Sequence, residues 1–277
     1  MNISQPELQT GFEKRDLTAH IGSEIDADVE TLLSGAISKE IIGLLEERGV
    51  VAFRELNLSD DEQIAFTKTL SSVSQTYEIT KITMDPIENP RAEYIKGAFY
   101  WHIDGTMLHT PIFASVMSSR RLSETGGQTE FSNTYAAYDS LSESDKQALE
   151  NLKVVHMFEV AQRYVTPEPT YQQLCDWQQH KPNVLPLVWT HKSGRKSLVL
   201  GSTASHIEGM DLREGWALLT RLRDWATQPR FVYRHEWKLG DLVIWDNTGT
   251  MHRALPYSLD SGRLMYRTQI AGDEPFA

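Results

Sequence analysis

Apolar runs of strand length in the last third of the chain are the feature that most constrains its fold. RFVYRHEW (230–237), DLVIWD (241–246) and RLMYRTQIA (263–271) are short and rich in β-branched and aromatic residues. Further strands are expected at 50–53, 110–119, 126–133 and 153–160, and longer helices only at 38–49, 59–70 and 211–227. Many strands with few crossover helices favour an antiparallel sandwich or barrel with helices packed outside. We therefore expect a mainly β fold with flanking helices.

The first two helical stretches carry signals for where they begin and end. Ser38 is the expected N-cap of the first helix, and Gly49 is its expected C-terminal stop. At the second helix, Ser59 followed by Glu62 forms a capping-box pattern.

Charge and composition exclude several classes of protein. The 277 residues carry a net charge of −11, which disfavours a nucleic-acid surface because phosphate binding needs clustered Lys and Arg. No stretch approaches the length of a transmembrane helix, and the beginning of the chain lacks an apolar signal-peptide core, so no membrane segment is expected. The single cysteine, Cys175, excludes an intrachain disulfide and fits a reducing compartment. We expect a cytoplasmic protein.

Nothing in the sequence divides the chain in two, so we expect one domain spanning residues 1–277. Between 73 and 98 the periodicity weakens and turn residues accumulate. Such irregular segments often carry binding residues, and we expect this one to face the substrate. Prolines between 161 and 185 indicate an insertion with some helix.

An imidazole and a carboxylate stand two positions apart in WHIDGT (101–106). In an extended segment, His102 and Asp104 would point the same way, roughly 6–7 Å apart along the chain. With a second histidine they would form a 2-His-1-carboxylate site, which is typical of non-heme Fe(II) oxygenases. Alone the pattern is weak, because an ordinary surface pair has the same spacing.

The C-terminal part of the chain supplies further polar candidates. His252 follows a turn after the buried run that ends at Asp246, and Arg263 and Arg267 follow within one expected strand. On an extended strand these arginines share one face, about 13 Å apart. Two arginines that face inward are unfavourable unless an anion meets them.

A set of motifs in this order resembles one known family. The motifs are WHIDGT, GGQTEF (126–131), THKSGRKSLVLGSTASHIEGM (190–210), FVYRHEW (231–237) and GDLVIWDN (240–247), followed by His252, Arg263 and Arg267. From about residue 21 to residue 275, the chain resembles the TauD/TfdA family of Fe(II)- and 2-oxoglutarate-dependent dioxygenases. It is nearer to the 2,4-dichlorophenoxyacetate dioxygenase branch than to the taurine dioxygenase branch.

The resemblance implies a double-stranded β-helix, or jelly-roll barrel, with a site for Fe(II), 2-oxoglutarate and O2. By position, three residues would be the iron ligands: His102, Asp104 and His252. Thr129 and Arg263 would hold the distal carboxylate of 2-oxoglutarate, a role that suits a planar guanidinium. Arg267 would lie nearer the metal and contact the substrate's anionic group or the C1 end of 2-oxoglutarate.

The implied reaction gives succinate and CO2 and hydroxylates a small organic acid with an apolar or aromatic body. Where the attacked carbon bears an ether oxygen, the product would collapse and the ether would be cleaved. Candidate substrate contacts are Arg267, Phe158, Gly105, Lys96 and Lys81, with Arg91 and Arg163 as further partners for the acid group. Ala98 stands where the taurine branch has an asparagine near its substrate, and Thr248 replaces the usual arginine after Trp-Asp-Asn. The resemblance therefore does not identify the substrate.

Other readings of the same residues stay open. Two histidines and a carboxylate also form zinc hydrolase sites, although hydrolysis needs no dicarboxylate cosubstrate. A non-catalytic relative could use the barrel mouth to bind a ligand. Arg263 could instead form a surface ion pair with Asp260 or Asp273. We expect the protein to form a homo-oligomer and to have no nucleic-acid or membrane partner.

Overall fold

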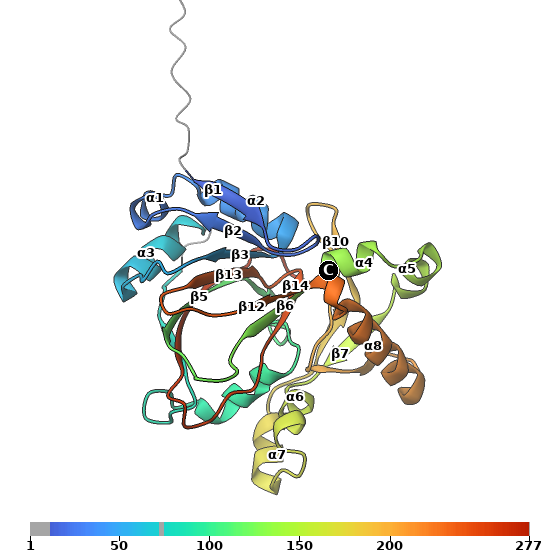
Figure 1. Cartoon of the computed structure of the whole chain (residues 1–277). Helices are drawn as coiled ribbons and strands as arrows, with labels where there is room; N and C mark the ends of the chain where they lie inside the picture. The colour runs from blue at the N-terminus through green and yellow to red at the C-terminus, as the bar shows by residue number, and fades with distance from the viewer. Residues whose placement is uncertain (1–11, 72–74, 277) are drawn as a thin grey trace, which may run out of the picture.

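The computed structural model describes residues 12–71 and 75–276 of the chain. Within these residues a seven-stranded sheet forms the larger wall of a barrel (Figure 1). In spatial order its strands are β1 (Glu13–Asp16), β2 (Ser23–Asp26), β3 (Val50–Phe53), β13 (Leu242–Asp246), β5 (Ile112–Arg121), β15 (Leu264–Ala271) and β4 (Thr80–Ile82). Neighbouring strands are antiparallel except β2 and β3, which are parallel.

A smaller antiparallel sheet faces the larger one. It contains β12 (Val232–His235), β6 (Thr129–Asn133) and β14 (Thr250–Ala254). Side chains of both sheets meet in a shared core that includes Trp245 of β13 and Phe131 of β6. Two mainly antiparallel sheets around one core form a jelly roll, so the predicted mainly β barrel is confirmed.

The central strand β13 is buried on both faces because its side chains alternate. Leu242 and Ile244 pack against elements outside the barrel, whereas Val243 and Trp245 enter the shared core. A strand covered on both sides needs an unbroken apolar run, which explains the composition of DLVIWD.

Three helices cover the outer face of the larger sheet (Figure 1): α1 (Val29–Ser34), α2 (Ser38–Arg48) and α3 (Asp60–Thr69). Gly49 ends α2 at φ 74°, and the predicted capping box of α3 is present. The predicted N-cap of α2 is wrong. The helix already includes Ser38, with Ile37 at the N-cap, and the Ser38 hydroxyl donates to α3 at 2.9 Å.

A second group of elements covers the outer face of the smaller sheet. These are α4 (Thr134–Asp139), α5 (Glu143–Leu149), β7 (Lys153–His156), β8 (Asn183–Pro186), β9 (Val188–Thr190), β10 (Lys196–Leu198), β11 (Ala204–Ile207), α8 (Leu212–Ala226) and η2 (Pro229–Phe231). Their apolar side chains form a separate core with Met251 of β14. Even α8, the longest described helix, is too short and too polar to cross a bilayer, as are the other described helices.

The expected irregular segment and the expected insertion pack on each other. The segment at 73–98 contains β4 and all but the last residue of η1 (Ala92–Phe99), while its residues 73 and 74 lie outside the described part. The insertion at 161–185 contains most of α6 (Phe158–Val165) and all of α7 (Tyr171–Gln178). Helix α6 contacts both η1 and α7, and the rings of Tyr94 and Phe158 are centred 6.1 Å apart.

The turn between β13 and β14 leaves no room for a side chain at Gly249, because a Cβ there would overlap the buried ring of Tyr135. Gly249→Ala should lower the midpoint of thermal unfolding by roughly 5–10 °C, since overpacking costs about 1–3 kcal/mol or more. The matched control is Gly43→Ala in α2, where a Cβ meets nothing within 4 Å and alanine favours the helix. Equal midpoints for the two variants would contradict this account.

Candidate metal centre

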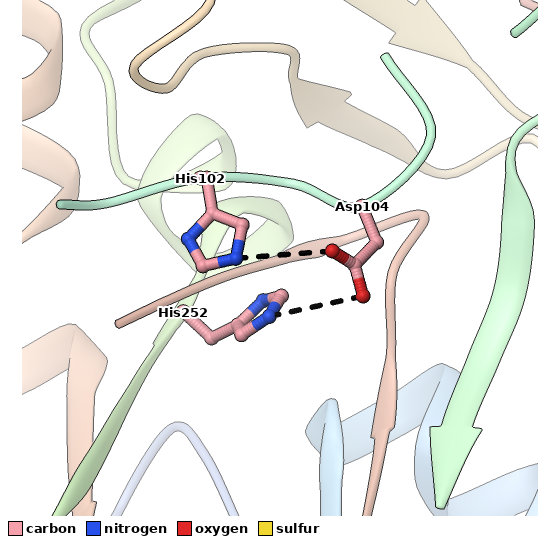
Figure 2. Close-up of side chains that lie close together, drawn as sticks. All are labelled: His102, Asp104 and His252. Carbon is pink, nitrogen blue, oxygen red and sulfur yellow. Dashed lines mark ion pairs between the residues drawn. The ribbon is translucent and has the colours of Figure 1, made fainter. Parts of the chain in front are cut away.

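The structure brings the three predicted metal ligands together from two distant parts of the chain (Figure 2). His102 and Asp104 lie on the segment between η1 and β5, and His252 lies on β14. Two backbone hydrogen bonds, with N···O distances of 3.0 and 2.9 Å, join His102 to His252. The sequence analysis had placed His252 just beyond a turn and had not predicted the strand that carries it.

The donor atoms of these side chains face one point without bonding to each other. One ligand atom of each residue lies within 4.8 Å of the other two. His102 Nε2 is 3.8 Å from Asp104 Oδ1, and His252 Nε2 is 4.0 Å from Asp104 Oδ2, so both distances exceed a hydrogen bond. Two imidazoles and one carboxylate in this arrangement can hold a divalent metal and leave coordination positions open.

The surroundings of both imidazoles favour the form that binds metal. His102 Nδ1 lies 2.9 Å from the Tyr100 carbonyl oxygen, which can only accept, so Nδ1 carries the hydrogen and Nε2 is free for a metal. Burial lowers the pKa of His252 well below its usual range, and the neighbouring His102 lowers it further. Neutral imidazole is the form that coordinates.

Asp104 is ionised despite its burial because the guanidinium of Arg267 lies beside it. Burial alone would raise its pKa, but the charge of Arg267, followed by His252 and His102, lowers the pKa to about 2. Arg267 Nη1 donates to Asp104 Oδ2 at 2.9 Å. The second predicted arginine therefore lies directly beside the metal-ligand cluster.

Arg263 is a buried cation without an acidic partner. It is 3% exposed, and its Nη2 donates to the Gly127 carbonyl oxygen at 3.0 Å. The guanidinium lies 4.8 Å from the centre of the Tyr257 ring and borders a pocket of about 190 Å³. Burial lowers the pKa of Arg263 below its ordinary value. No carboxylate of the described residues pairs with it, so the alternative ion pair with Asp260 or Asp273 is not observed.

The hydroxyl oxygen of Thr129 already accepts a hydrogen bond. The indole N–H of Trp237 donates to Thr129 Oγ1 at 2.9 Å, which leaves the Thr129 O–H free to donate. Trp237 also borders the pocket of Arg263 and so connects the two residues. From the sequence, Trp237 was expected only to be part of the core or of a pocket wall, and its bond to Thr129 was not predicted, although an indole N–H that is partly buried needs a partner.

One predicted substrate contact faces away from the cluster. Lys81 stands opposite Tyr266 in the pairing of β4 with β15, whereas Arg267 stands opposite Thr80. Lys81 and Arg267 therefore point to opposite faces of the sheet. Lys81 also pairs with Glu88 at 3.6 Å. This position argues against a contact with a molecule bound beside Arg267.

The other predicted substrate contacts lie on the loops and helices around the cluster. Gly105 has φ 91°, and a Cβ there would approach the backbone of β5, so its turn requires glycine. Phe158 packs against η1, while Lys96 and Arg91 are exposed. Arg163 forms an ion pair within α6. Among the predicted substrate contacts, Arg267 is the one whose side chain touches a predicted metal ligand.

A groove of about 1130 Å³ lies on the opposite face of the smaller sheet. Its floor includes Glu130, whose carboxylate accepts hydrogen bonds from Arg234 and Arg253. Arg253 follows His252 on β14, and successive residues of a strand point to opposite faces. The groove is therefore separate from the candidate metal centre.

A buried histidine supports the loop that follows Asp104. His156 is fully buried, and its Nδ1 lies 2.8 Å from the hydroxyl of Thr203. That hydroxyl lies 2.9 Å from the hydroxyl of Thr106, two residues beyond Asp104. Burial lowers the pKa of His156 to about 4, so the ring is neutral near pH 7.

Comparisons with known proteins agree with this geometry. The family model described as Taurine catabolism dioxygenase TauD, TfdA family matches residues 13–269. An alpha-ketoglutarate-dependent 2,4-dichlorophenoxyacetate dioxygenase of Burkholderia sp. (strain RASC) is 32% identical over 91% of this chain and 91% of its own length. An (S)-phenoxypropionate/alpha-ketoglutarate-dioxygenase of Sphingobium herbicidovorans is 30% identical over 82% of this chain and 83% of its own length.

Solved structures match as well. The crystal structure of AAD-2 in complex with Mn(II) and N-oxalylglycine superposes with a TM-score of 0.82. It is 32% identical, and the match covers 96% of this chain and 99% of that one. A putative alpha-ketoglutarate dependent 2,4-D dioxygenase from Burkholderia xenovorans has a TM-score of 0.77 and 30% identity over 95% of this chain and 98% of that one.

The buried neutral ring of His156 should make the protein less stable in acid. In the unfolded chain this histidine titrates near its usual value of 6.5, whereas in the folded chain its pKa is about 4, so stability is lost as the pH falls from 6.5 toward 4. Between pH 7 and pH 5, urea titrations should show wild type losing about 2 kcal/mol more than His156→Leu. Equal losses would show that His156 does not carry this dependence.

Proposed function

Because the chain belongs to the TauD, TfdA family, we propose that it is an Fe(II)- and 2-oxoglutarate-dependent dioxygenase that hydroxylates a small organic acid with an apolar or aromatic body. The reaction would consume O2 and release succinate and CO2. Cleavage of an ether would follow where the attacked carbon bears an ether oxygen.

The buried guanidinium of Arg263 is the observation that carries this proposal. A cation at 3% exposure with no acidic partner among the described residues is unfavourable by several kcal/mol unless an anion meets it. The distal carboxylate of 2-oxoglutarate is such an anion and fits the planar fork of an arginine. The free O–H of Thr129 supplies a further donor. Hydrolysis needs no dicarboxylate cosubstrate, so a hydrolase would not require this buried guanidinium and free hydroxyl.

The metal-ligand cluster fits Fe(II). His102 and His252 would bind through Nε2 and Asp104 through its carboxylate, which is ionised beside Arg267. Bound Fe(II) would supply the activation of O2 that the oxidative decarboxylation requires. The three protein ligands would leave positions for the 2-oxo acid and for O2. Asp104 thereby serves as an anionic ligand, and Arg267 keeps it deprotonated.

The relatives indicate the class of substrate. Two of the relatives described above are named for 2,4-dichlorophenoxyacetate and phenoxypropionate, which are aromatic ether acids. We propose that acids of this kind are the substrates. Arg267 would be the anion contact nearest the metal, and Gly105 and Phe158 would border the bound acid. The single cysteine supports a reducing, cytoplasmic location. Assembly as a homo-oligomer stays a prediction.

Purified protein with Fe(II), 2-oxoglutarate, ascorbate and air should release succinate when it is given its substrate. The panel comprises phenoxyalkanoates, sulfonates, alkyl sulfates and N-acyl amino acids, and we expect phenoxyalkanoates to respond most. Succinate and O2 uptake are measured against Asp104→Ala, which lacks a ligand. A wild-type protein that binds Mn(II) but stays at the background of this variant with every acid would reject the proposal. Turnover with Zn(II) in the absence of O2 would instead identify a hydrolase.

Replacement of Arg263 should weaken 2-oxoglutarate binding without affecting the metal. Arg263→Lys loses one branch of the guanidinium fork, so the Kd for 2-oxoglutarate should rise roughly 10- to 100-fold. Calorimetry on Mn(II)-loaded protein measures this Kd, and a separate titration measures the affinity for Mn(II). The control is Arg15→Lys on β1, which is exposed on the same sheet and pairs with Glu24. An unchanged Kd in Arg263→Lys would remove this residue from the binding site.

A further inference from the structure

A buried line of polar side chains runs from the centre of the larger sheet to Asp104. The indole N–H of Trp245 donates to Asn247 Oδ1 at 2.8 Å, and Asn247 Nδ2 donates to Ser115 Oγ at 3.1 Å. The Ser115 hydroxyl donates in turn to Asp104 Oδ2 at 3.3 Å. Trp245 is 1% exposed, and Asn247 and Ser115 are completely buried, so these bonds do not compete with bulk water.

The hydrogen bonds of this line can run in only one direction. An indole nitrogen is only a donor, and an ionised carboxylate is only an acceptor. The two ends therefore fix the amide of Asn247 and the hydroxyl of Ser115 between them. A flipped amide would place its NH2 against the Trp245 N–H and leave buried donors unsatisfied. The single hydrogen of Ser115 is thus directed to Asp104.

The two oxygens of Asp104 have different surroundings. Oδ2 accepts from Ser115, from Arg267 at 2.9 Å and from Gln269 at 3.3 Å. Among the described residues no donor bonds to Oδ1, which lies 3.8 Å from His102 Nε2. Oδ2 is therefore occupied by hydrogen bonds, and Oδ1 keeps its lone pairs for a metal.

We propose that Asn247 is a positioning residue that acts through Ser115 to fix the rotation of the Asp104 carboxylate, so that Oδ1 is the metal ligand. A carboxylate that binds through one oxygen leaves open a coordination position that a bidentate one would fill. The inference rests on the proposed function, since it takes the cluster to hold a metal. It also gives a role to Trp245 and Asn247 of the GDLVIWDN motif, and the Trp245 ring packs 4.8 Å from that of His252.

The test measures Co(II) binding, because the visible absorption of bound Co(II) reports its ligand geometry. Asn247→Asp replaces the donor NH2 by an acceptor, which draws the Ser115 hydrogen away from Asp104, and Ser115→Ala removes that hydrogen. Each change should weaken Co(II) binding by roughly 10- to 100-fold and alter the absorption bands. The double variant should be no weaker than Ser115→Ala, because both changes act through one O–H.

The matched control is Ser118→Ala, which is also buried on β5 but faces Gln63 on the other side of the strand. It should retain wild-type affinity and absorption. If Asn247→Asp does not fold, Co(II) binding by Ser115→Ala and Trp245→Phe tests the proposal instead.

Wild-type binding and absorption in Ser115→Ala, additive losses in the double variant, or an equal loss in Ser118→Ala would overturn the proposal. Succinate formation by wild type is measured in parallel. Its absence would reject the proposed function, whereas altered Co(II) binding by the variants of an active enzyme concerns the positioning of Asp104 alone.

Discussion

The two-sided burial of β13 is the constraint on which the rest of the structure depends. Leu242 and Ile244 attach the outer helices, while Val243 and Trp245 fill the barrel. The neighbouring strand β5 alternates in the same way, with Ser115 on the inner face. Because alternate residues serve separate surfaces, the outer face supplies most of the apolar packing and the inner face can carry polar groups. The site is thus built against central strands that are largely buried on both faces.

The site holds two charged side chains, Asp104 and Arg263, that differ in how they are paired. Asp104 is neutralised by Arg267, so its charge is stable in the protein as it stands. Arg263 has only a carbonyl oxygen and an aromatic ring beside it. An unpaired buried cation makes the fold less stable than an apolar residue would, and an anionic ligand removes that disadvantage. Arg267 therefore pairs with a metal ligand of the protein itself, whereas Arg263 is left to bind an anionic cosubstrate.

Local patterns in the sequence were enough for the fold class, the capping box of α3 and seven of the fifteen described strands, and the family resemblance identified the ligand set. What they missed is long-range. The segment around His252 is polar and turn-like, and it is a strand because it pairs with β6. The bond from Asn247 to Ser115 joins residues 132 positions apart, which no local pattern encodes. Lys81 was chosen for its charge, but charge does not reveal which face of a strand a residue occupies.

The backbone pairing of His102 with His252 also bears on how the chain reaches its native state. The two residues flank most of the jelly roll, so their pairing closes a very long loop and depends on the last strands being in place. A nascent chain that already contains His102 and Asp104 has two of the ligands but no complete site. Metal binding is therefore coupled to closure of the barrel. Tight coordination is expected only of a chain that has completed this closure.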